Sequence, residues 1–460
     1  MVLLGATVIV AAGCGGGGQT GSTTSPAAPR PSSSHPAPIL APLRPVWVNV
    51  VDGDTGRLVA GARVTARGFV RHGASLFTRR QARSVTVTTW APHYSSRTIR
   101  FALDLSRHLT VRIYRTDGQW LMYGATPART QFHEGISLRP PFRTVWTKYL
   151  GTLLEFPAVI DDGIAYLTNF SGKLFALSMT DGRTLWEQDL NAKPQASSPA
   201  VVGSRLVVHA MASGRVVVLD RASGRVLWSR ETSARIESSP AVVDGIDYLG
   251  NWAGDIYALD LKTHRNRWVY HDGCKITASV TVAGGVVYVG DYCGRVLALR
   301  RTTGKLLWSS SAGSPIYGSS ALAGGRLFVP SRGAGALYAF TTGGRYLWHV
   351  STGGLVYSGP AVWNGRVYFG SYTGTLYCVS AATGAVLWTR YAGGPISGSP
   401  TVIDGVVYVG SFGHRILGID GRTGRTLLDF PHGEYVAVSG NRSKLLFYGW
   451  ATIWAVEPKT

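Results

Sequence analysis

The 460-residue sequence is poor in charged residues, which make up only 15% of the chain, and it holds just four cysteines and four methionines. No apolar run reaches the roughly 18 residues that a membrane-spanning helix needs, so we expect no such helix. The scarcity of charge contrasts with 58 glycines and an aromatic share of 11%. Because Gly favours turns and aromatic residues favour strands, this composition predicts a turn-rich all-β protein. A hydrophobic share of 45% excludes global disorder.

Acidic residues are scarcer than basic ones, with 25 Asp and Glu against 46 Lys and Arg, which gives a net charge of +21. The excess is mostly arginine and is concentrated in residues 1–143. A charge of this sign favours anionic partners such as wall polymers or lipid headgroups. An arginine-rich surface that only faces solvent explains the same composition. Because the chain start indicates export, we do not expect a nucleic-acid partner.

The first 45 residues are typical of an export signal and a linker. The apolar residues 2–12 are too few to span a membrane, and they end at Ala11-Ala12-Gly13-Cys14. This segment resembles a bacterial lipoprotein signal, which implies that Cys14 is lipidated and becomes the mature N-terminus. We therefore expect a signal peptide over 1–14, a Gly/Ser/Pro-rich linker over 15–45, and a membrane anchor on the extracytoplasmic side. A plain secretory signal is the alternative.

Residues 46–116 predict a small β-sandwich domain. Strand-like runs alternate with turn clusters over residues 46–51, 58–64, 84–89, 98–103 and 109–114. The segment VVDGDTGRLVAGARVTA resembles the carboxypeptidase-regulatory or prealbumin-like sandwich domains of exported proteins. The resemblance implies a spacer or adhesion module, and no catalytic constellation stands out in it.

The rest of the chain is a repeat of about 40 residues, marked by tryptophans that often follow a Thr-Gly or Ser-Gly pair. Each unit contains four short strands separated by Gly turns, which is the pattern of a β-propeller blade. We expect these tryptophans to pack structurally against neighbouring blades. They are Trp146, Trp186, Trp228, Trp268, Trp308, Trp348 and Trp388.

The two ends of the repeat predict how the ring closes. Trp146 lies in a strand without the other three strands of its unit, whereas residues 435–439, 444–448 and 452–456 supply three strands without a fourth. Together they make one shared blade, so we expect an eight-bladed propeller over 144–460. Residues 117–143 form a leader segment ahead of it.

The unit SGPAVWNGRVYFGSYTGTLYCVSAATGAVLW resembles the pyrroloquinoline-quinone (PQQ) repeat of quinoprotein-like propellers. The leader WLMYGATPARTQFH resembles the segment that often precedes such propellers, with Ala125 where glycine is frequent. The family includes PQQ-dependent dehydrogenases and non-enzymatic scaffold lipoproteins, among them the propeller of the outer-membrane-protein assembly machine. The resemblance therefore implies the fold and leaves the function open.

The site features that the resemblance implies for a dehydrogenase are missing from the sequence. The alcohol-oxidising members of that family bind PQQ with calcium, and a disulfide between adjacent cysteines covers the cofactor. No two of the four cysteines here are adjacent, and the even spacing leaves little room for site-building insertions. Asp161, Asp162 and Asp404 fit first-hairpin turns better than catalysis. We expect a non-enzymatic protein with no metal and no cofactor, and PQQ with calcium only under the dehydrogenase alternative.

The cysteines suggest one cross-link within a single unit. Cys274 lies in the connection that enters a blade, and Cys293 lies in the second hairpin turn of the same blade, so both fall on one face. In an exported protein this arrangement favours a disulfide, and two small buried side chains are the alternative. Cys378 is expected to be buried and free.

The second hairpin turn also indicates a binding face. It carries an aromatic residue in five units, Phe170, Trp252, Tyr292, Tyr372 and Phe412, and Arg332 in another. The connections entering the blades share that face and add Arg235, Glu237, Lys275, Tyr317 and Tyr357. Such a surface suits an extended peptide or sugar, although the aromatics could serve only to pack blades together. We expect a monomeric envelope scaffold that binds a protein or an anionic wall polymer; a carbohydrate-binding protein is a further alternative.

Overall fold

The computed structural model describes residues 44–72, 75–78, 83–103 and 107–459. Apart from the single 3-10 turn η1 (Thr116–Gly118), its regular elements are β-strands, so the predicted all-β propeller class is confirmed. None of the described residues belongs to a helix with the length and apolarity needed to cross a membrane. The expected signal peptide, linker and Cys14 lipidation site lie outside the described residues.

The small domain consists of two sheets that enclose one apolar core. The first has the order β3-β4-β1-β7 and the second β2-β5-β6. Val48, Val87 and Val111 lie in the core between them. The strands are β1 (Arg44–Asp52), β2 (Arg63–Ala66), β3 (Val70–His72), β4 (Ser75–Thr78), β5 (Ser84–Trp90), β6 (Arg97–Ala102) and β7 (His108–Ile113).

The strand expected over residues 58–64 is wrong. Leu58 forms only an isolated bridge to Val51, and the next strand, β2, starts at Arg63 and pairs with β5 in the other sheet. Gly61 has φ +72°, a left-handed conformation, and the chain crosses between the sheets at this point. The strands that pair with β1 are β4, which runs antiparallel to it, and β7, which runs parallel to it. The local sequence gave no sign of this long-range pairing.

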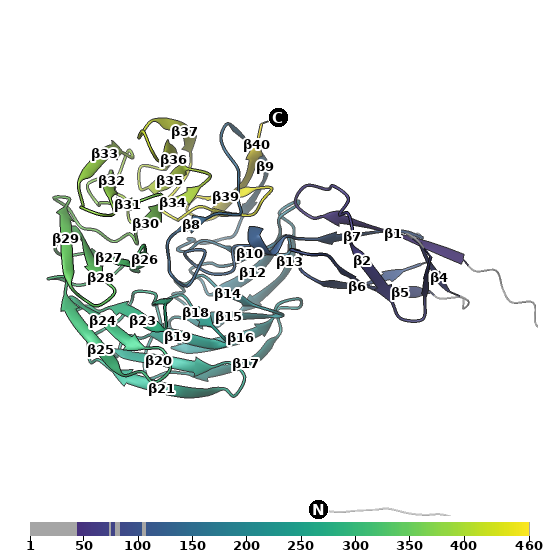
Figure 1. The fold of residues 1–460 in the computed structure, drawn as a ribbon, viewed down its shortest axis with the longest axis horizontal. Helices are drawn as coiled ribbons and strands as arrows, with labels where there is room; N and C mark the ends of the chain where they lie inside the picture. The colour runs from purple at the N-terminus through teal and green to yellow at the C-terminus, as the bar shows by residue number, and fades with distance from the viewer. Residues whose placement is uncertain (1–43, 73–74, 79–82, 104–106, 460) are drawn as a thin grey trace, which may run out of the picture.

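The remaining strands form sheets arranged radially in a ring, as Figure 1 shows. Within each sheet, consecutive strands pair antiparallel from the ring centre outward. The first sheets contain β10 (Val159–Asp161), β11 (Ile164–Thr168), β12 (Lys173–Ser178) and β13 (Thr184–Asp189); β14 (Ala200–Val202), β15 (Arg205–Ala210), β16 (Arg215–Asp220) and β17 (Val226–Glu231); β18 (Ala241–Val243), β19 (Ile246–Gly250), β20 (Asp255–Asp260) and β21 (Arg265–His271); and β22 (Thr281–Ala283), β23 (Val286–Gly290), β24 (Arg295–Arg300) and β25 (Leu306–Ser311).

The later sheets continue the ring and close it. They contain β26 (Ala321–Ala323), β27 (Arg326–Ser331), β28 (Ala336–Thr341) and β29 (Tyr346–Ser351); β30 (Ala361–Trp363), β31 (Arg366–Gly370), β32 (Thr375–Ser380) and β33 (Val386–Tyr391); β34 (Thr401–Ile403), β35 (Val406–Ser411), β36 (Arg415–Asp420) and β37 (Thr426–Pro431), joined by β8 (Phe132–His133); and β38 (Ser439–Gly440), β39 (Leu445–Tyr448) and β40 (Thr452–Pro458), joined by β9 (Phe142–Tyr149). The strand β9, which carries Trp146, pairs antiparallel with β40, so the two ends of the repeat share one sheet.

A tryptophan–glycine contact joins most sheets to the next one in the ring. The Trp186 indole donates to the Arg221 carbonyl at 3.1 Å, and its ring covers Gly224, where an added Cβ would lie 2.5 Å from the ring. Gly224 has φ +72°, which favours glycine on its own account. A tryptophan ring lies over a glycine of the next sheet in the same way in five further pairs: Trp146–Gly182, Trp268–Gly304, Trp308–Gly344, Trp348–Gly384 and Trp388–Gly424. Trp228 instead stacks on His264, with ring centroids 4.3 Å apart.

The leader segment lies along the inner edge of the ring and accepts hydrogen bonds from the innermost strands. Backbone N–H groups of these strands donate to leader carbonyls at 2.7–2.9 Å, one after another around the ring. The donor–acceptor pairs are Ile160–Trp120, Val201–Leu121, Val282–Pro127, Leu322–Ala128, Val362–Thr130 and Val402–Gln131. Ala125, which stands where related leaders often have glycine, has φ +66°. The leader thus covers strand edges that would otherwise be bare.

Arg129 of the leader is the charged anchor of this arrangement. Its side chain is fully buried, and it donates to the carbonyls of Val280, Pro240, Ser239 and Tyr123. Burial lowers the pKa of Arg129 to about 10, so the guanidinium keeps its proton at neutral pH. One side chain therefore ties the leader to two neighbouring sheets.

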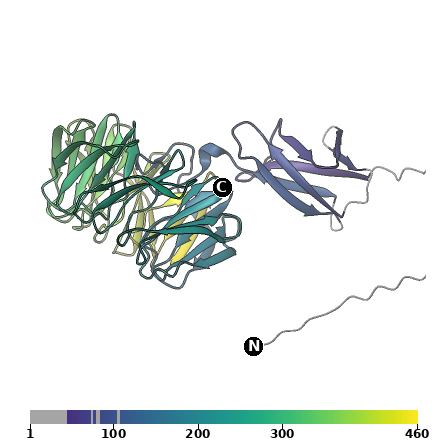
Figure 2. The same cartoon turned by 90° about the horizontal axis from the view of Figure 1, so that it is seen from below.

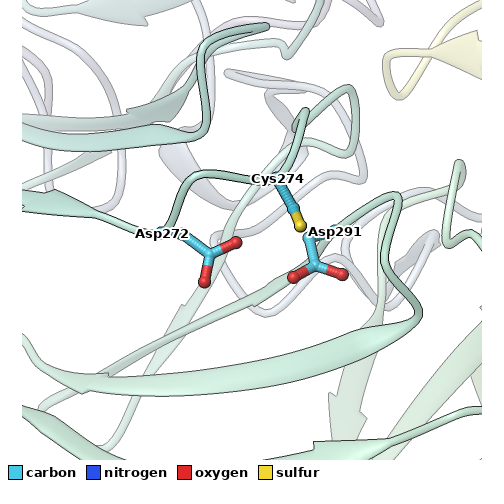
Figure 3. A group of neighbouring side chains, drawn as sticks. All are labelled: Asp272, Cys274 and Asp291. Carbon is cyan, nitrogen blue, oxygen red and sulfur yellow. The ribbon is translucent and has the colours of Figure 1, made fainter.

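A disulfide joins Cys274, in the connection between β21 and β22, to Cys293, in the turn between β23 and β24. Asp272 and Asp291 lie beside Cys274 (Figure 3), and their carboxylates approach its sulfur within 4.8 Å. Arg295 binds both carboxylates, at 2.7 Å to Asp272 and 2.8 Å to Asp291. Burial and the neighbouring Asp291 raise the pKa of Asp272 to about 6. The sulfur is in a disulfide and Arg295 bridges the two carboxylates, so this cluster is an ion network that braces the turn. Cys378 is buried and free.

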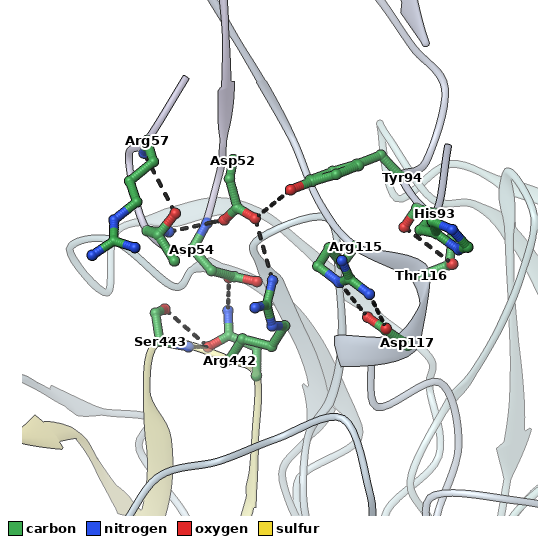
Figure 4. A network of polar contacts seen from close by, with 12 residues as sticks. Asp52, Asp54, Arg57, His93, Tyr94, Arg115, Thr116, Asp117, Arg442 and Ser443 are labelled. Carbon is green, nitrogen blue, oxygen red and sulfur yellow. Dashed lines mark hydrogen bonds and ion pairs between the residues drawn. The ribbon is translucent and has the colours of Figure 1, made fainter. Parts of the chain in front are cut away.

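The small domain docks on the propeller through polar contacts of its first turn (Figure 4). Asp52 accepts from the Tyr94 hydroxyl at 2.9 Å and from Arg442 at 3.2 Å. Asp54 accepts from the Asn441 side chain at 2.9 Å, and its second carboxylate oxygen is buried without a partner. Burial, reinforced by the charge of Asp52, raises the pKa of Asp54 to about 7.

This docking surface consists of first-hairpin turns of the propeller. Asn441 and Arg442 lie between β38 and β39, and Asp162, which accepts from Ser95 at 2.5 Å, lies between β10 and β11. Second-hairpin turns leave the opposite end of the same strands. The small domain, which Figure 2 shows beside the ring, therefore leaves the second-hairpin face of the propeller uncovered.

We predict that Arg129→Met lowers the free energy of unfolding by at least about 3 kcal/mol, because several buried carbonyls lose their donor. Urea denaturation measures this loss. Arg183→Met is the matched control, since its side chain is 74% exposed and its removal should change stability by less than about 0.5 kcal/mol. Equal stability of the two variants would contradict the anchoring role.

We predict that ionisation of Asp54 weakens the folded protein as the pH rises from about 4 to about 7. The raised pKa means that the folded state holds the Asp54 proton more tightly than the unfolded chain does, so stability is lost as that proton leaves. In Asp54→Asn, the melting temperature should therefore depend less on pH over this window than it does in the natural chain. The control is Asp244→Asn, whose carboxylate is 75% exposed. A profile for Asp54→Asn that matches the control would refute the prediction.

Candidate functional site

The second-hairpin face presents the predicted turn residues in a repeated geometry. In each case the backbone N–H of the turn residue donates to a carbonyl of the connection that enters the same sheet. These pairs are Phe170–Leu153, Trp252–Arg235, Tyr292–Lys275, Arg332–Pro315, Tyr372–Leu355 and Phe412–Pro395, at 2.8–3.0 Å. Turn and connection therefore form one rigid unit, and their side chains are held next to each other.

Neighbouring units bring their aromatic rings into one continuous band, which we call the aromatic arc. It consists of Trp252, Tyr292, Tyr317, Tyr357, Tyr372, Phe412 and Tyr435. Successive ring centroids from Tyr292 to Tyr435 lie 4.6–6.4 Å apart. Tyr372 and Phe412 remain 42% and 36% exposed, so the arc offers ring surface to a partner.

Cations stack on the outer part of the arc. The Lys275 ammonium lies 3.6 Å from the Trp252 ring centroid and 4.7 Å from that of Tyr292, and it bridges the two rings. Arg235 lies over Trp252 at 5.2 Å, and Arg332 lies over Tyr357 at 4.9 Å. Because Lys275 follows Cys274 and Tyr292 precedes Cys293, the disulfide holds this bridge in place.

One of the predicted turn residues lies outside the arc. Two aromatic residues on this face were also missed from the sequence as candidates for binding. Phe170 makes no ring contact to the arc within the described part of the chain. Trp450 lies in the corresponding turn between β39 and β40 and is 58% exposed, but it was not predicted because this last unit is irregular. Tyr435 was expected to start a strand, whereas β38 starts only at Ser439. Its position in the repeat matches that of Tyr317 and Tyr357, and this match was the available signal.

A cavity of about 90 Å³ lies on the ring axis beside the arc. Tyr317, Tyr357 and Tyr435 line it from the arc, and Tyr123 of the leader lines it from the other side. The Tyr123 hydroxyl hydrogen-bonds to Ser399 at 2.9 Å. Serines link the sheets around the axis, because the backbone N–H of Ser239 donates to the Ser279 hydroxyl, and that of Ser279 to the Ser319 hydroxyl. The cavity is thus framed by hydroxyl groups and aromatic rings.

Two carboxylates, Glu155 and Glu237, also line this cavity. Glu237 accepts from the Trp252 indole at 3.1 Å and from the Tyr317 hydroxyl at 2.5 Å, which fixes its orientation. Glu155 accepts from the Tyr435 hydroxyl. Burial raises the pKa of Glu155, and the charge of Glu237 adds to this rise. Sequence analysis missed Glu155, although it stands where most repeats have a small residue such as Ser197 or Ser238.

The residues of the cavity do not suit PQQ. That cofactor is a planar tricarboxylate and needs basic or neutral donors around its anionic groups. The described residues that line the cavity include two carboxylates and neither lysine nor arginine, and Tyr123 and Tyr435 occupy its walls. A volume of about 90 Å³ is also small for a fused three-ring molecule.

The chain matches the family model described as outer membrane protein assembly factor BamB over residues 142–273, 269–355 and 333–446. No curated protein sequence is significantly similar to it.

Many solved structures share its fold, and three of them illustrate the likeness. BamB from Moraxella catarrhalis superposes with a TM-score of 0.59 at 17% identity, over 70% of this chain and 98% of its own. The quinohemoprotein alcohol dehydrogenase from Comamonas testosteroni gives 0.64 at 15% identity, over 75% and 81%. The computationally designed Ika8 protein gives 0.60 at 17%, over 69% and 100%.

At these identities the likeness concerns the fold, which BamB, an alcohol dehydrogenase and a designed protein share. The family model, by contrast, spans nearly the whole ring. The predicted resemblance to PQQ-repeat propellers is therefore confirmed, and the chain belongs to the PQQ-repeat family described as outer membrane protein assembly factor BamB.

Proposed function

We propose that this protein is a non-enzymatic scaffold of the bacterial cell envelope that binds an extended protein segment across its aromatic arc. The observation that carries the proposal is the arc itself: a rigid band of rings on one face, with Lys275, Arg235 and Arg332 stacked along it. Aromatic and arginine side chains dominate the energetics of protein interfaces. The description of the family as an assembly factor supports a protein as the partner.

The proposed architecture follows the sheet arrangement. We infer eight blades, with β8 added to one and β9 completing another, and a small β-sandwich over residues 46–116 ahead of the leader at 117–143. The protein acts as a monomer and is anchored on the extracytoplasmic side through a lipid at Cys14. Docking of the sandwich on the first-hairpin side supports this orientation, because the arc then faces away from the tethered end.

Two alternatives predict different ligands. A PQQ-dependent dehydrogenase would bind PQQ with calcium saturably and oxidise an alcohol in a dye-linked assay. A protein that binds wall polymer would retain anionic polymer rather than a protein, and the stacked cations of the arc favour this reading over carbohydrate without charge. We rank both below the protein scaffold, which needs no cofactor.

We predict that replacing Trp252, Tyr292 and Tyr372 together by alanine abolishes capture of the partner. The full chain serves as bait in a cross-linked pull-down from envelope extract, and the captured species is identified by mass spectrometry. The expected result is that one specific protein is captured by the natural chain and lost with the triple variant. The variant removes three rings of the arc, including the two on which the Lys275 ammonium stacks.

The control triple variant replaces Trp90, Leu307 and Leu387, which are 44%, 41% and 47% exposed away from this face. It should capture the partner as the natural chain does. If the triple variant of the arc captures the same protein as the natural chain, or if only polymer is captured, the proposed protein scaffold is rejected.

A further inference from the structure

The axial cavity contains two carboxylates that form no ion pair with any cation among the described residues. The protein as a whole has a net charge of +21. Nevertheless, among the ion pairs of the described residues none involves Glu155 or Glu237. Glu237 is only 9% exposed, and a buried carboxylate is costly unless it is paired. Unpaired negative charge at this place in a basic protein points to a cationic ligand.

The nearby cations are already engaged elsewhere. Arg129 lies behind the cavity, with its guanidinium 5.6 Å from the Tyr123 ring centroid, and it donates to four backbone carbonyls. Lys275 and Arg235 stack on Trp252, and Arg332 stacks on Tyr357. Charge is thus segregated on this face, with carboxylates at the axis and cations on the surrounding rings.

The walls of the cavity offer what an ammonium group needs. The carboxylates of Glu155 and Glu237 can accept charge-assisted hydrogen bonds. The rings of Tyr317, Tyr357 and Tyr435 line the same space, and aromatic faces attract cations. The cavity, at about 90 Å³, is small and open toward the arc, which suits the end of one side chain rather than a whole small molecule.

The hydrogen bonds favour an ammonium over a guanidinium. A guanidinium binds best when one carboxylate offers both oxygens to its planar fork. Both oxygens of Glu237 already accept, one from Trp252 and the other from Tyr317. An ammonium is compact, and its donors can rotate toward the remaining lone pairs of separate acceptors.

We propose that the axial cavity binds a primary ammonium group carried by the partner that lies across the aromatic arc. This inference rests on the proposed function for the place of the partner, and it adds the chemical group that the centre of the site recognises. In the extended protein segment of the proposed function, a lysine side chain carries this group. An amino sugar of a wall polymer carries the same group and is the alternative that the test separates.

The test titrates small probes into the purified full chain by calorimetry. Nα-acetyl-lysine methylamide should bind saturably with one site, and raising the salt concentration should weaken it. Its Nε-acetylated form and the matching arginine compound should bind at least tenfold more weakly. Glucosamine, run in parallel, distinguishes the two sources: stronger binding of the lysine compound assigns the site to peptide, and stronger binding of glucosamine assigns it to polymer.

Two variants locate the bound group. Glu155→Gln keeps an acceptor for Tyr435 and removes one charge, so it should weaken the lysine compound at least tenfold. Glu231→Gln, at an exposed position at the end of β17, is the control and should bind like the natural chain. Circular dichroism verifies that both variants are folded.

Three results overturn the inference: no saturable binding of either amine, equal binding of the Nε-acetylated compound, or unchanged affinity in folded Glu155→Gln. Calcium binding that the amines do not displace would overturn it as well. The proposed function fails separately, because the arc variant tests capture of the partner without any ammonium probe. A captured partner with no amine binding rejects the cavity inference alone, whereas amine binding without a captured partner rejects the scaffold alone.

Discussion

The contact between a tryptophan of one sheet and a left-handed glycine of the next is the interaction on which the rest of this structure depends. The ring of Trp186 occupies the space that a side chain at Gly224 would need, and its indole binds the neighbouring backbone. Repetition of this contact packs neighbouring sheets together at six junctions of the ring. Where the two ends of the repeat meet, β9 supplies the last strand of the final sheet, and its Trp146 covers Gly182 of the first.

The leader makes the two faces of the ring different. Its carbonyls pair with the innermost strands, and Arg129 fastens it through buried hydrogen bonds. The small domain docks on the same side, through Asp52 and Asp54. What remains accessible is the second-hairpin face with its arc and its axial cavity. Under the proposed function, a partner would therefore approach this one face, because the leader and the small domain occupy the other.

Charge on that face is arranged against the overall composition. The protein is strongly basic, and cations line the arc, yet its axis carries Glu155 and Glu237. Trp252 contacts both kinds of charge: Lys275 and Arg235 stack on its ring, and its indole N–H donates to Glu237. The disulfide between Cys274 and Cys293 stiffens the two backbone segments that hold Lys275 and Tyr292. Such a site is preorganised, which lowers the ordering cost of binding.

The sequence by itself determined the repeat, the strand pattern and the face on which the turn aromatics lie, because these features recur locally every 40 or so residues. Strand alternation and Gly turns are encoded within a few neighbouring residues. The same local reasoning failed for residues 58–64 of the small domain, where pairing of β1 with β7 joins segments more than 50 residues apart. Only the tertiary structure decided the axial cavity. Glu155, Glu237 and Tyr435 come from units far apart in the chain, and local patterns do not show that they share one cavity. They meet because closure of the ring brings the entering connections of different sheets to a common axis.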